Sequence, residues 1–107
     1  MPNKEIKVLK FANTESAKLY VNAKTIAALI IPNDAAFDGK TLTFKAGVST
    51  DNLSTLKDMN GSVITVTLSA ASVIALDLPY FAGITHIQLI ASGSLDGKFV
   101  TVIFREL

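Results

Sequence analysis

The chain has 107 residues, enough for one domain with one modest hydrophobic core. Half of the residues are hydrophobic and the mean hydropathy is +0.43, yet the longest apolar run covers only Ile26 to Ile31, which excludes a membrane-spanning helix of about 20 residues. The net charge of +1 comes from scattered lysines and no cysteine is present, so the composition favours neither nucleic-acid binding nor disulfides nor a thiolate metal site.

Short runs rich in Val, Ile, Thr and Phe, separated by Asn, Asp, Gly and Ser, predict β-strands along the whole chain. The segment "EIKVLKF" changes its apolar phase between Val8 and Leu9, which predicts a bulge or an edge position. The segments "TIAALII", ended by Pro32, and "FVTVIF" lack alternation, which predicts central strands covered on both sides. By contrast, "KTLTFKA" alternates and predicts a half-buried strand.

Three dipeptides, Asp38-Gly39, Asn60-Gly61 and Asp96-Gly97, predict tight turns because glycine accepts a positive φ. The predicted strands lie near residues 5–11, 15–21, 25–31, 40–46, 62–68, 72–77, 84–91 and 98–105, with a looser connection from Gly47 to Asn60 and no convincing helix. About eight short strands in a single domain, residues 1–107, predict an all-β fold of two packed antiparallel sheets. We expect a jelly-roll-like β-sandwich, with a small barrel as the alternative.

No group of residues predicts a reaction site. The single histidine, His86, lies beside Gln88 on the face opposite Ile87 and Leu89, without a nucleophile signature, so we expect a surface or interface residue. The aspartates lie mostly in turns, and the spacing of Asp34 and Asp38 matches no calcium loop. Gly-rich phosphate loops are absent as well. We therefore expect no enzymatic activity, no cofactor and no metal.

The apolar surplus predicts a subunit interface, because obligate interfaces resemble a core cut in half. A homo-oligomer, either a trimer or a dimer, is expected. Tyr20, on the outer face of its strand, is a candidate contact residue. With no tryptophan and two tyrosines, the chain offers little of the aromatic platform that a carbohydrate-binding module presents.

The segment from Asp77 to Gly83, "DLPYFAG", places two aromatics in a corner between two strands. Asp77 can cap the following amides, Pro79 pre-sets φ for one helical turn, and Gly83 provides a flexible exit. The segment predicts a structural corner in which Phe81 plugs the open end of the sandwich and Tyr80 lies on its rim.

"IALDLPYFAGITHIQLIASG", preceded by "TIAALIIPNDAAFDGKTLTFKAG", resembles a family of small virion-associated proteins of tailed bacteriophages. In that family an Ile-Ala-Leu element leads to a Phe-Ala-Gly corner and then to a strand that ends near Ser-Gly. The matching positions are Ile74, Ala75, Leu76, Phe81, Ala82, Gly83, Ser92 and Gly93, with Ile31, Pro32, Leu42, Thr43 and Phe44 upstream. The likeness spans about Thr25 to Phe104, although "SGSLDGKFV" is shorter here than the insertion that familiar members often carry. It implies a structural particle component with a β-sandwich fold and no enzymatic activity.

The leading interpretation is a head decoration or cement subunit of a phage that self-associates and contacts the major capsid protein. A neck, tail or fibre-anchoring component is the alternative, and a carbohydrate-binding module or an enzyme ranks lower. The N-terminus lacks a signal peptide, so synthesis in the host cytoplasm and a final place in the virion are expected, without nucleic-acid or membrane partners. Contacts are expected from termini, loop tips and rim aromatics, namely Asn3, Lys4, Asp38, Lys40, Lys57, Asp58, Tyr20 and Tyr80.

Overall fold

The computed structural model describes residues 4–21, 24–76 and 84–106, and in these residues every strand pairing is antiparallel. The all-β prediction is confirmed. The elements are β1 (Lys4–Ala12), β2 (Glu15–Ser16), β3 (Leu19–Tyr20), β4 (Lys24–Ile31), the 3-10 turn η1 (Ala35–Phe37), β5 (Thr41–Gly47), β6 (Ser54–Thr55), β7 (Thr65–Thr67), β8 (Ser72–Ala75), β9 (His86–Ala91) and β10 (Phe99–Glu106).

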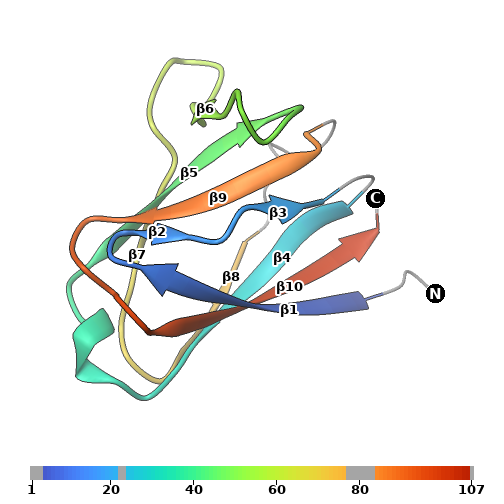
Figure 1. Ribbon diagram of the computed structural model, residues 1–107. Helices are drawn as coiled ribbons and strands as arrows, with labels where there is room; N and C mark the ends of the chain where they lie inside the picture. The colour runs from blue at the N-terminus through green and yellow to red at the C-terminus, as the bar shows by residue number, and fades with distance from the viewer. Residues whose placement is uncertain (1–3, 22–23, 77–83, 107) are drawn as a thin grey trace.

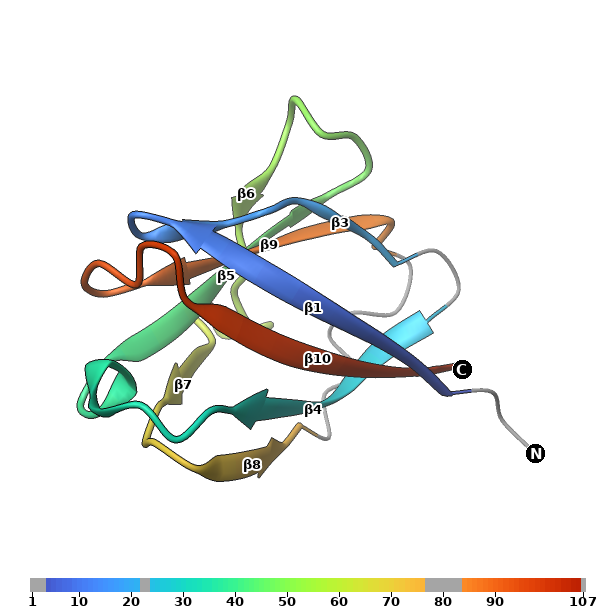
Figure 2. The same cartoon turned by 60° about the horizontal axis from the view of Figure 1, so that its bottom comes forward.

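The sheet curls so that two halves face each other, as Figures 1 and 2 show. One half, called the β1 half, has the strand order β1-β10-β4-β8; the other, called the β9 half, has β2 and β3 beside β9, then β5, with β6 and β7 pairing with β5. β1 continues into the β9 half through its pairing with β2. Because the chain crosses from half to half between most consecutive strands, the arrangement is that of a jelly roll, as predicted.

The hydrophobic core fills the space between the two halves. Alternate residues of each strand point inward, which places large apolar side chains from both halves in contact. The largest fully buried side chains are those of Phe11, Phe37, Phe44, Phe104, Ile26, Leu29, Ile31, Leu42, Leu68, Ile87 and Leu89. Burying each such side chain contributes roughly 1.5–3 kcal/mol, so this layer is the main stabilising term of the fold.

The predicted turns are confirmed, because Gly39, Gly61 and Gly97 all have a positive φ, between 74° and 84°. Two predicted strands are shorter than expected. Residues 15–21 divide into β2 and β3, since the Ser16 hydroxyl, and not a backbone carbonyl, accepts the N–H of Leu89 at 2.9 Å. Residues 62–68 contain only β7.

The first part of residues 62–68 folds back on the preceding loop, where Ile64 N–H donates to Leu56 O and Lys57 forms an isolated bridge with Val63. Two elements were not predicted. β6 pairs with β5 inside the connection expected to be loose. η1 forms because the Asp34 carboxylate accepts the N–H of Ala36 at 2.9 Å and caps the turn.

β1 contains no bulge, because its register with β10 is continuous from Lys4 to Lys10. Over these residues it pairs with no other described strand, so the alternative prediction of an edge position is confirmed. The bulge of the β1 half lies instead between β10 and β4, at Ile103 and Phe104.

Glu5 and Lys7 lie on the inward side of β1 and form an ion pair, with 3.2 Å between Oε1 and Nζ. Together with Leu19, Tyr20 and Lys24 they line an open cavity of about 330 Å³.

β4 and β10 are central strands, as predicted, but the described chain covers them on one side only. Their inward residues are buried, whereas Ala28 and Ile30 of β4 and Ile103 of β10 are partly exposed, and Phe99 is 50% exposed. Among the described residues, the expected cover on both sides is therefore incomplete. The predicted corner residues Asp77, Pro79, Tyr80, Phe81 and Gly83 lie outside the described residues, as does Asn3.

An ion pair between Asp34 and Lys98, 2.7 Å between Oδ2 and Nζ, joins the turn before β5 to the turn before β10. The hydrogen bond from Lys98, aided by the N–H of Ala36, holds the pKa of Asp34 below its ordinary value of 3.8. A lowered folded-state pKa means that the carboxylate stabilises the fold above the unfolded pKa and loses this effect as the pH falls through the folded pKa.

We predict that Asp34→Asn destabilises the protein at neutral pH and that its difference from the parent shrinks as the pH is lowered below 3.8. Denaturant unfolding at a series of pH values measures this difference. Asp51→Asn, an exposed change in the loop between β5 and β6, is the matched control. A difference that stays constant down to acid pH would contradict the assignment.

The two sides of β10 allow a paired test of where the core lies. Phe104 is 2% exposed and points inward, whereas Phe99 on the same strand is 50% exposed. Phe104→Ala should cost about 3–5 kcal/mol in unfolding free energy. Phe99→Ala should cost less than about 1 kcal/mol. Urea unfolding measures both, and equal losses would show that the inward and outward assignments of β10 are wrong.

Candidate interaction surface

The outward side of the β1 half is apolar across all four strands. The pairing register aligns Ile6, Ile103, Ala28 and Ala75 in one row and Val8, Thr101, Ile30 and Val73 in the next. Phe99 follows opposite Lys10, whose Nζ lies 5.9 Å from the centre of the ring. We call these residues, Ile6, Val8, Ala28, Ile30, Val73, Ala75, Phe99, Thr101 and Ile103, the outer apolar face.

The large side chains on the outer strands of this face are exposed, whereas Ile30 and Ile103 on its central strands are partly buried. Ile6 is 62%, Val8 59% and Val73 68% exposed. Single exposed apolar residues are ordinary, but contiguous apolar patches on a monomer mark interaction sites. The outer apolar face is therefore the strongest candidate for a functional surface in the described residues.

The outward side of the β9 half has the opposite character. Its outward positions on β5 and β7 include the polar residues Thr41, Thr43, Lys45, Thr65 and Thr67, whereas on β9 the outward Gln88 is buried and Ile90 is partly buried. Between them, the inward residues Leu42, Phe44 and Leu89 are buried. This alternation of polar and apolar residues is typical of a sheet with one face in solvent. The two outer faces of the protein thus differ, and only that of the β1 half is apolar.

A groove continues the outer apolar face at its Phe99 end. Its volume is about 300 Å³, and it is lined by Ile30, Pro32, Asp34, Phe37, Gly97, Lys98, Phe99 and Thr101. Asp34 and Lys98 neutralise each other in this lining. The remaining lining is largely apolar, so the groove enlarges the apolar surface available to a partner.

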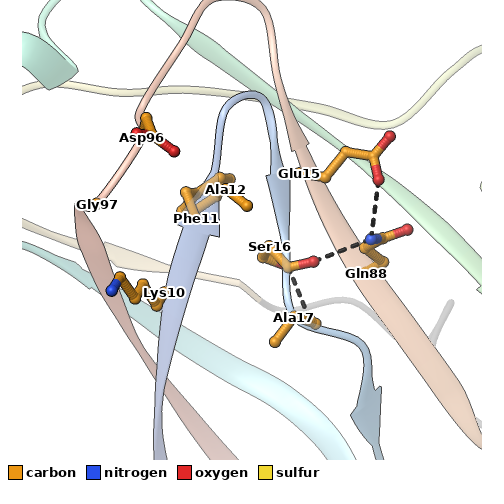
Figure 3. A pocket seen from close by; sticks show the side chains of 9 residues that line it. All are labelled: Lys10, Phe11, Ala12, Glu15, Ser16, Ala17, Gln88, Asp96 and Gly97. Carbon is orange, nitrogen blue, oxygen red and sulfur yellow. Dashed lines mark hydrogen bonds between the residues drawn. The ribbon is translucent and has the colours of Figure 1, made fainter.

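A larger cavity of about 540 Å³ lies at the seam between the two halves, around the hairpin of β1 and β2 (Figure 3). In Figure 3, Glu15, Ser16 and Gln88 lie on one side of the hairpin and Lys10 and Asp96 on the other. Phe11, Ala12, Ala17 and Gly97 complete the lining.

The polar groups on the β2 side of this seam cavity bind one another, whereas Asp96 Oδ1 accepts the N–H of Asn13 at 2.9 Å. Gln88 Nε2 donates to the carbonyl oxygen of Ser16 at 2.9 Å and to Glu15 Oε2 at 3.4 Å. The Ser16 hydroxyl donates to the carbonyl of Ala17 and accepts the N–H of Leu89, both at 2.9 Å. A serine engaged in this way, with no histidine in the lining, is not an activated nucleophile. These bonds join β2 to β9 and have a structural role.

Tyr20, predicted as a contact residue, is 62% exposed on β3. Its ring makes an edge-on contact with the ring of His86 on β9, with 5.2 Å between centroids. The Nδ1 of His86 lies 2.9 Å from the Thr85 hydroxyl. Both rings belong to the β9 half, so they lie away from the outer apolar face.

The predicted loop-tip residues mainly form hydrogen bonds with turns and loops of the same chain. Asp38 Oδ1 accepts the N–H of Ala70 at 2.8 Å, Asp58 Oδ1 accepts those of Asn60 and Ser62 at 2.8 and 3.0 Å, and Lys40 donates to the carbonyl of Ala36. Lys57 is exposed. Asp38 and Lys40 flank the turn into β5, whereas Lys4 begins β1 at the opposite end of the molecule (Figure 1). The structure therefore does not gather these residues into one patch.

In residues 4–21, 24–76 and 84–106, no three His, Asp or Glu side chains are grouped so that they could hold a metal ion. The same ranges contain no helix with the length and apolar character needed to cross a bilayer.

The sequence did not single out the outer apolar face, although its signals were present. The apolar phase change in β1 and the missing alternation in β4 and β10 mark strands whose outward residues are apolar as well as their inward ones. The phase change in β1 predicts a bulge or an edge position, and the missing alternation in β4 and β10 predicts cover on both sides. No pattern in one chain distinguishes cover by its own residues from cover by another molecule.

No protein-family model matches the chain, and no curated protein sequence matches it. Among solved structures, the chain is similar to the SPBc2 prophage-derived protein YomS, with a TM-score of 0.61 and 12% sequence identity. The match covers 98% of this chain and 94% of that protein. At this identity the likeness shows a shared fold over nearly the whole length of both chains.

Proposed function

We propose that this protein is a non-enzymatic structural component of a bacteriophage virion, a head decoration or cement subunit that binds the capsid lattice and associates with copies of itself. The observation that carries the proposal is the outer apolar face on an otherwise ordinary jelly roll. Two observations support a phage setting: the resemblance of the corner and strand segments to virion proteins of tailed phages, and the similarity of the fold to that of a prophage-derived protein.

The mechanism follows from linkage. A protein that binds the assembled lattice, and not its dissociated subunits, stabilises the lattice by mass action. Many copies that bridge neighbouring capsomers multiply a modest contact energy. The outer apolar face supplies this contact, because burying apolar surface stabilises a complex by roughly 25 cal/mol per Å² before the costs of association.

A neck, tail or fibre-anchoring position in the same kind of particle is the second candidate. Such a component would also bind through the outer apolar face and would also be non-enzymatic. It differs from a decoration protein in its copy number. A decoration protein covers a lattice in hundreds of copies, whereas a neck or tail ring holds about a dozen.

We predict that quantitative mass spectrometry of purified virions finds the chain in hundreds of copies per particle. Particles assembled without it should form and should release their DNA at a lower temperature than the parent. A copy number near a dozen, with normal heat resistance of the heads, would favour the neck or tail alternative. Absence from purified virions would overturn the structural proposal itself.

We predict that Val8→Asp lowers the affinity for capsids at least about tenfold, because an unpaired carboxylate would be buried in the contact. Val8 is 59% exposed, so the variant should fold. Thr65→Asp, an exposed change on the β9 half, is the matched control and should bind like the parent. Sedimentation of the variants with capsids measures the effect, and equal binding by both would exclude the outer apolar face as the contact.

A further inference from the structure

β8 is the outermost strand of the β1 half, and among the described residues it pairs with β4 alone. The N–H of Leu76 donates to the carbonyl of Ala27 at 2.8 Å, which fixes the hydrogen-bonding phase of the strand. Alternation then directs the peptide groups of Ser72 and Ile74 toward β4 and those of Val73 and Ala75 toward the open edge. The edge therefore offers two N–H and two C=O groups to an added strand.

β8 and the chain before it carry no charge. From Gly61 to Leu76 there is no Asp, Glu, Lys or Arg, and Asp77 is the first charged residue after the strand. Edge strands are commonly protected from pairing by charged residues, especially lysine, or by proline. The opposite edge of the same half is protected in this way, since β1 contains Lys4, Lys7 and Lys10. The contrast indicates that β8, and not β1, is the edge adapted to pair.

We propose that β8 pairs in antiparallel fashion with β8 of a second copy, about a two-fold axis at Ile74. This inference rests on the proposed function, because it names the contact through which the virion protein would self-associate. In this register Val73 lies opposite Ala75 of the second copy. The peptide groups that each copy directs to the open edge of β8 then hydrogen-bond each other. The pairing adds strands across the junction and joins the two β1 halves into one sheet.

Three features favour a second copy over another partner. The two-fold pairing is self-complementary, as an isologous contact requires. Because the strand is uncharged, no like charges meet across the axis. The positive φ of 53° at Ala71 ends the extended backbone just before Ser72, so the pairing begins no earlier than Ser72, and a centre at Ile74 lets Val73 and Ala75 both bond to the second copy.

The pairing also increases the size of the outer apolar face. Four strands about 4.8 Å apart, with about two outward positions each, span about 300 Å² in projection, well under half of the roughly 800 Å² that a standard interface buries per partner. Val73 and Ala75 end the two rows of this face at β8, so the rows continue into the second copy. A dimer would double this face and bring it closer to the size that stable docking needs.

Sedimentation velocity over a micromolar to millimolar concentration series tests the proposal. Ala75→Pro removes an N–H that points to the open edge and leaves the bonds to β4 in place. It should raise the dimer dissociation constant at least about tenfold, because the dimer loses two hydrogen bonds by symmetry. Val73→Lys should have a similar effect, while Thr65→Lys on the β9 half should have none. A parent protein that remains monomeric, or a dimer unaffected by both β8 changes, would overturn the proposal.

Hydrogen exchange gives a second measurement that does not depend on a substitution. The amides of Val73 and Ala75 should become protected as the concentration of the parent protein rises, whereas edge amides of β1 should not. Protection that is independent of concentration would contradict pairing between copies. The two proposals fail separately: a chain present in virions but without β8 pairing would leave the virion role intact, and a β8 dimer absent from virions would do the reverse.

Discussion

The structure depends on one constraint. A chain of this length has enough apolar residues to fill one core layer between two sheets, and no more. That layer, in which Phe44 and Leu89 of the β9 half face Leu29 and Phe104 of the β1 half, holds the jelly roll together. Few residues remain to cover the outer sides of the sheets. On the β9 half the outward threonines need no cover, whereas the outward residues of the β1 half are apolar and the described chain leaves them in solvent. The surface that suggests a function is thus a consequence of how the core is filled.

The fold was largely predictable from the sequence because its signals are local. Inward alternation, proline at the end of β4 and glycine at three tight turns each depend on a few neighbouring residues. The jelly-roll prediction is confirmed for the same reason, since many short strands in one small domain leave few arrangements. The errors occur where a side chain replaces a backbone partner. Ser16 takes the N–H of Leu89 and divides a predicted strand, and Asp34 caps a turn where no helical element was expected.

The candidate surface was less predictable, because exposure depends on tertiary structure. The apolar surplus predicts an interface, but the residues predicted for it lie at termini and loop tips or are rim aromatics. The structure gives several of the loop-tip charges a structural role, since the carboxylates of Asp38 and Asp58 accept backbone N–H groups. The outward apolar residues of β4 and β10 were interpreted as buried by the chain itself. Only the register of four strands brings Ile6, Ile103, Ala28 and Ala75 into one row.

The outer apolar face and the uncharged edge of β8 meet at Val73, so the proposed self-association and the proposed docking would use adjoining surfaces. Part of the apolar surplus of the composition lies in this exposed face. The proposals also assign different roles to the two outer faces: partners would cover the outward side of the β1 half, and the β9 half, with Tyr20 and its polar residues, would face solvent.

The central claim is that assembly covers the outward side of the β1 half, and hydroxyl-radical footprinting of the protein on purified particles tests it most directly. Compared with the free protein, Ile6, Val8 and Phe99 should lose reactivity on the particle, while Tyr20 on the β9 half should retain it. Protection of Tyr20, with Phe99 as reactive as in the free protein, would contradict the account.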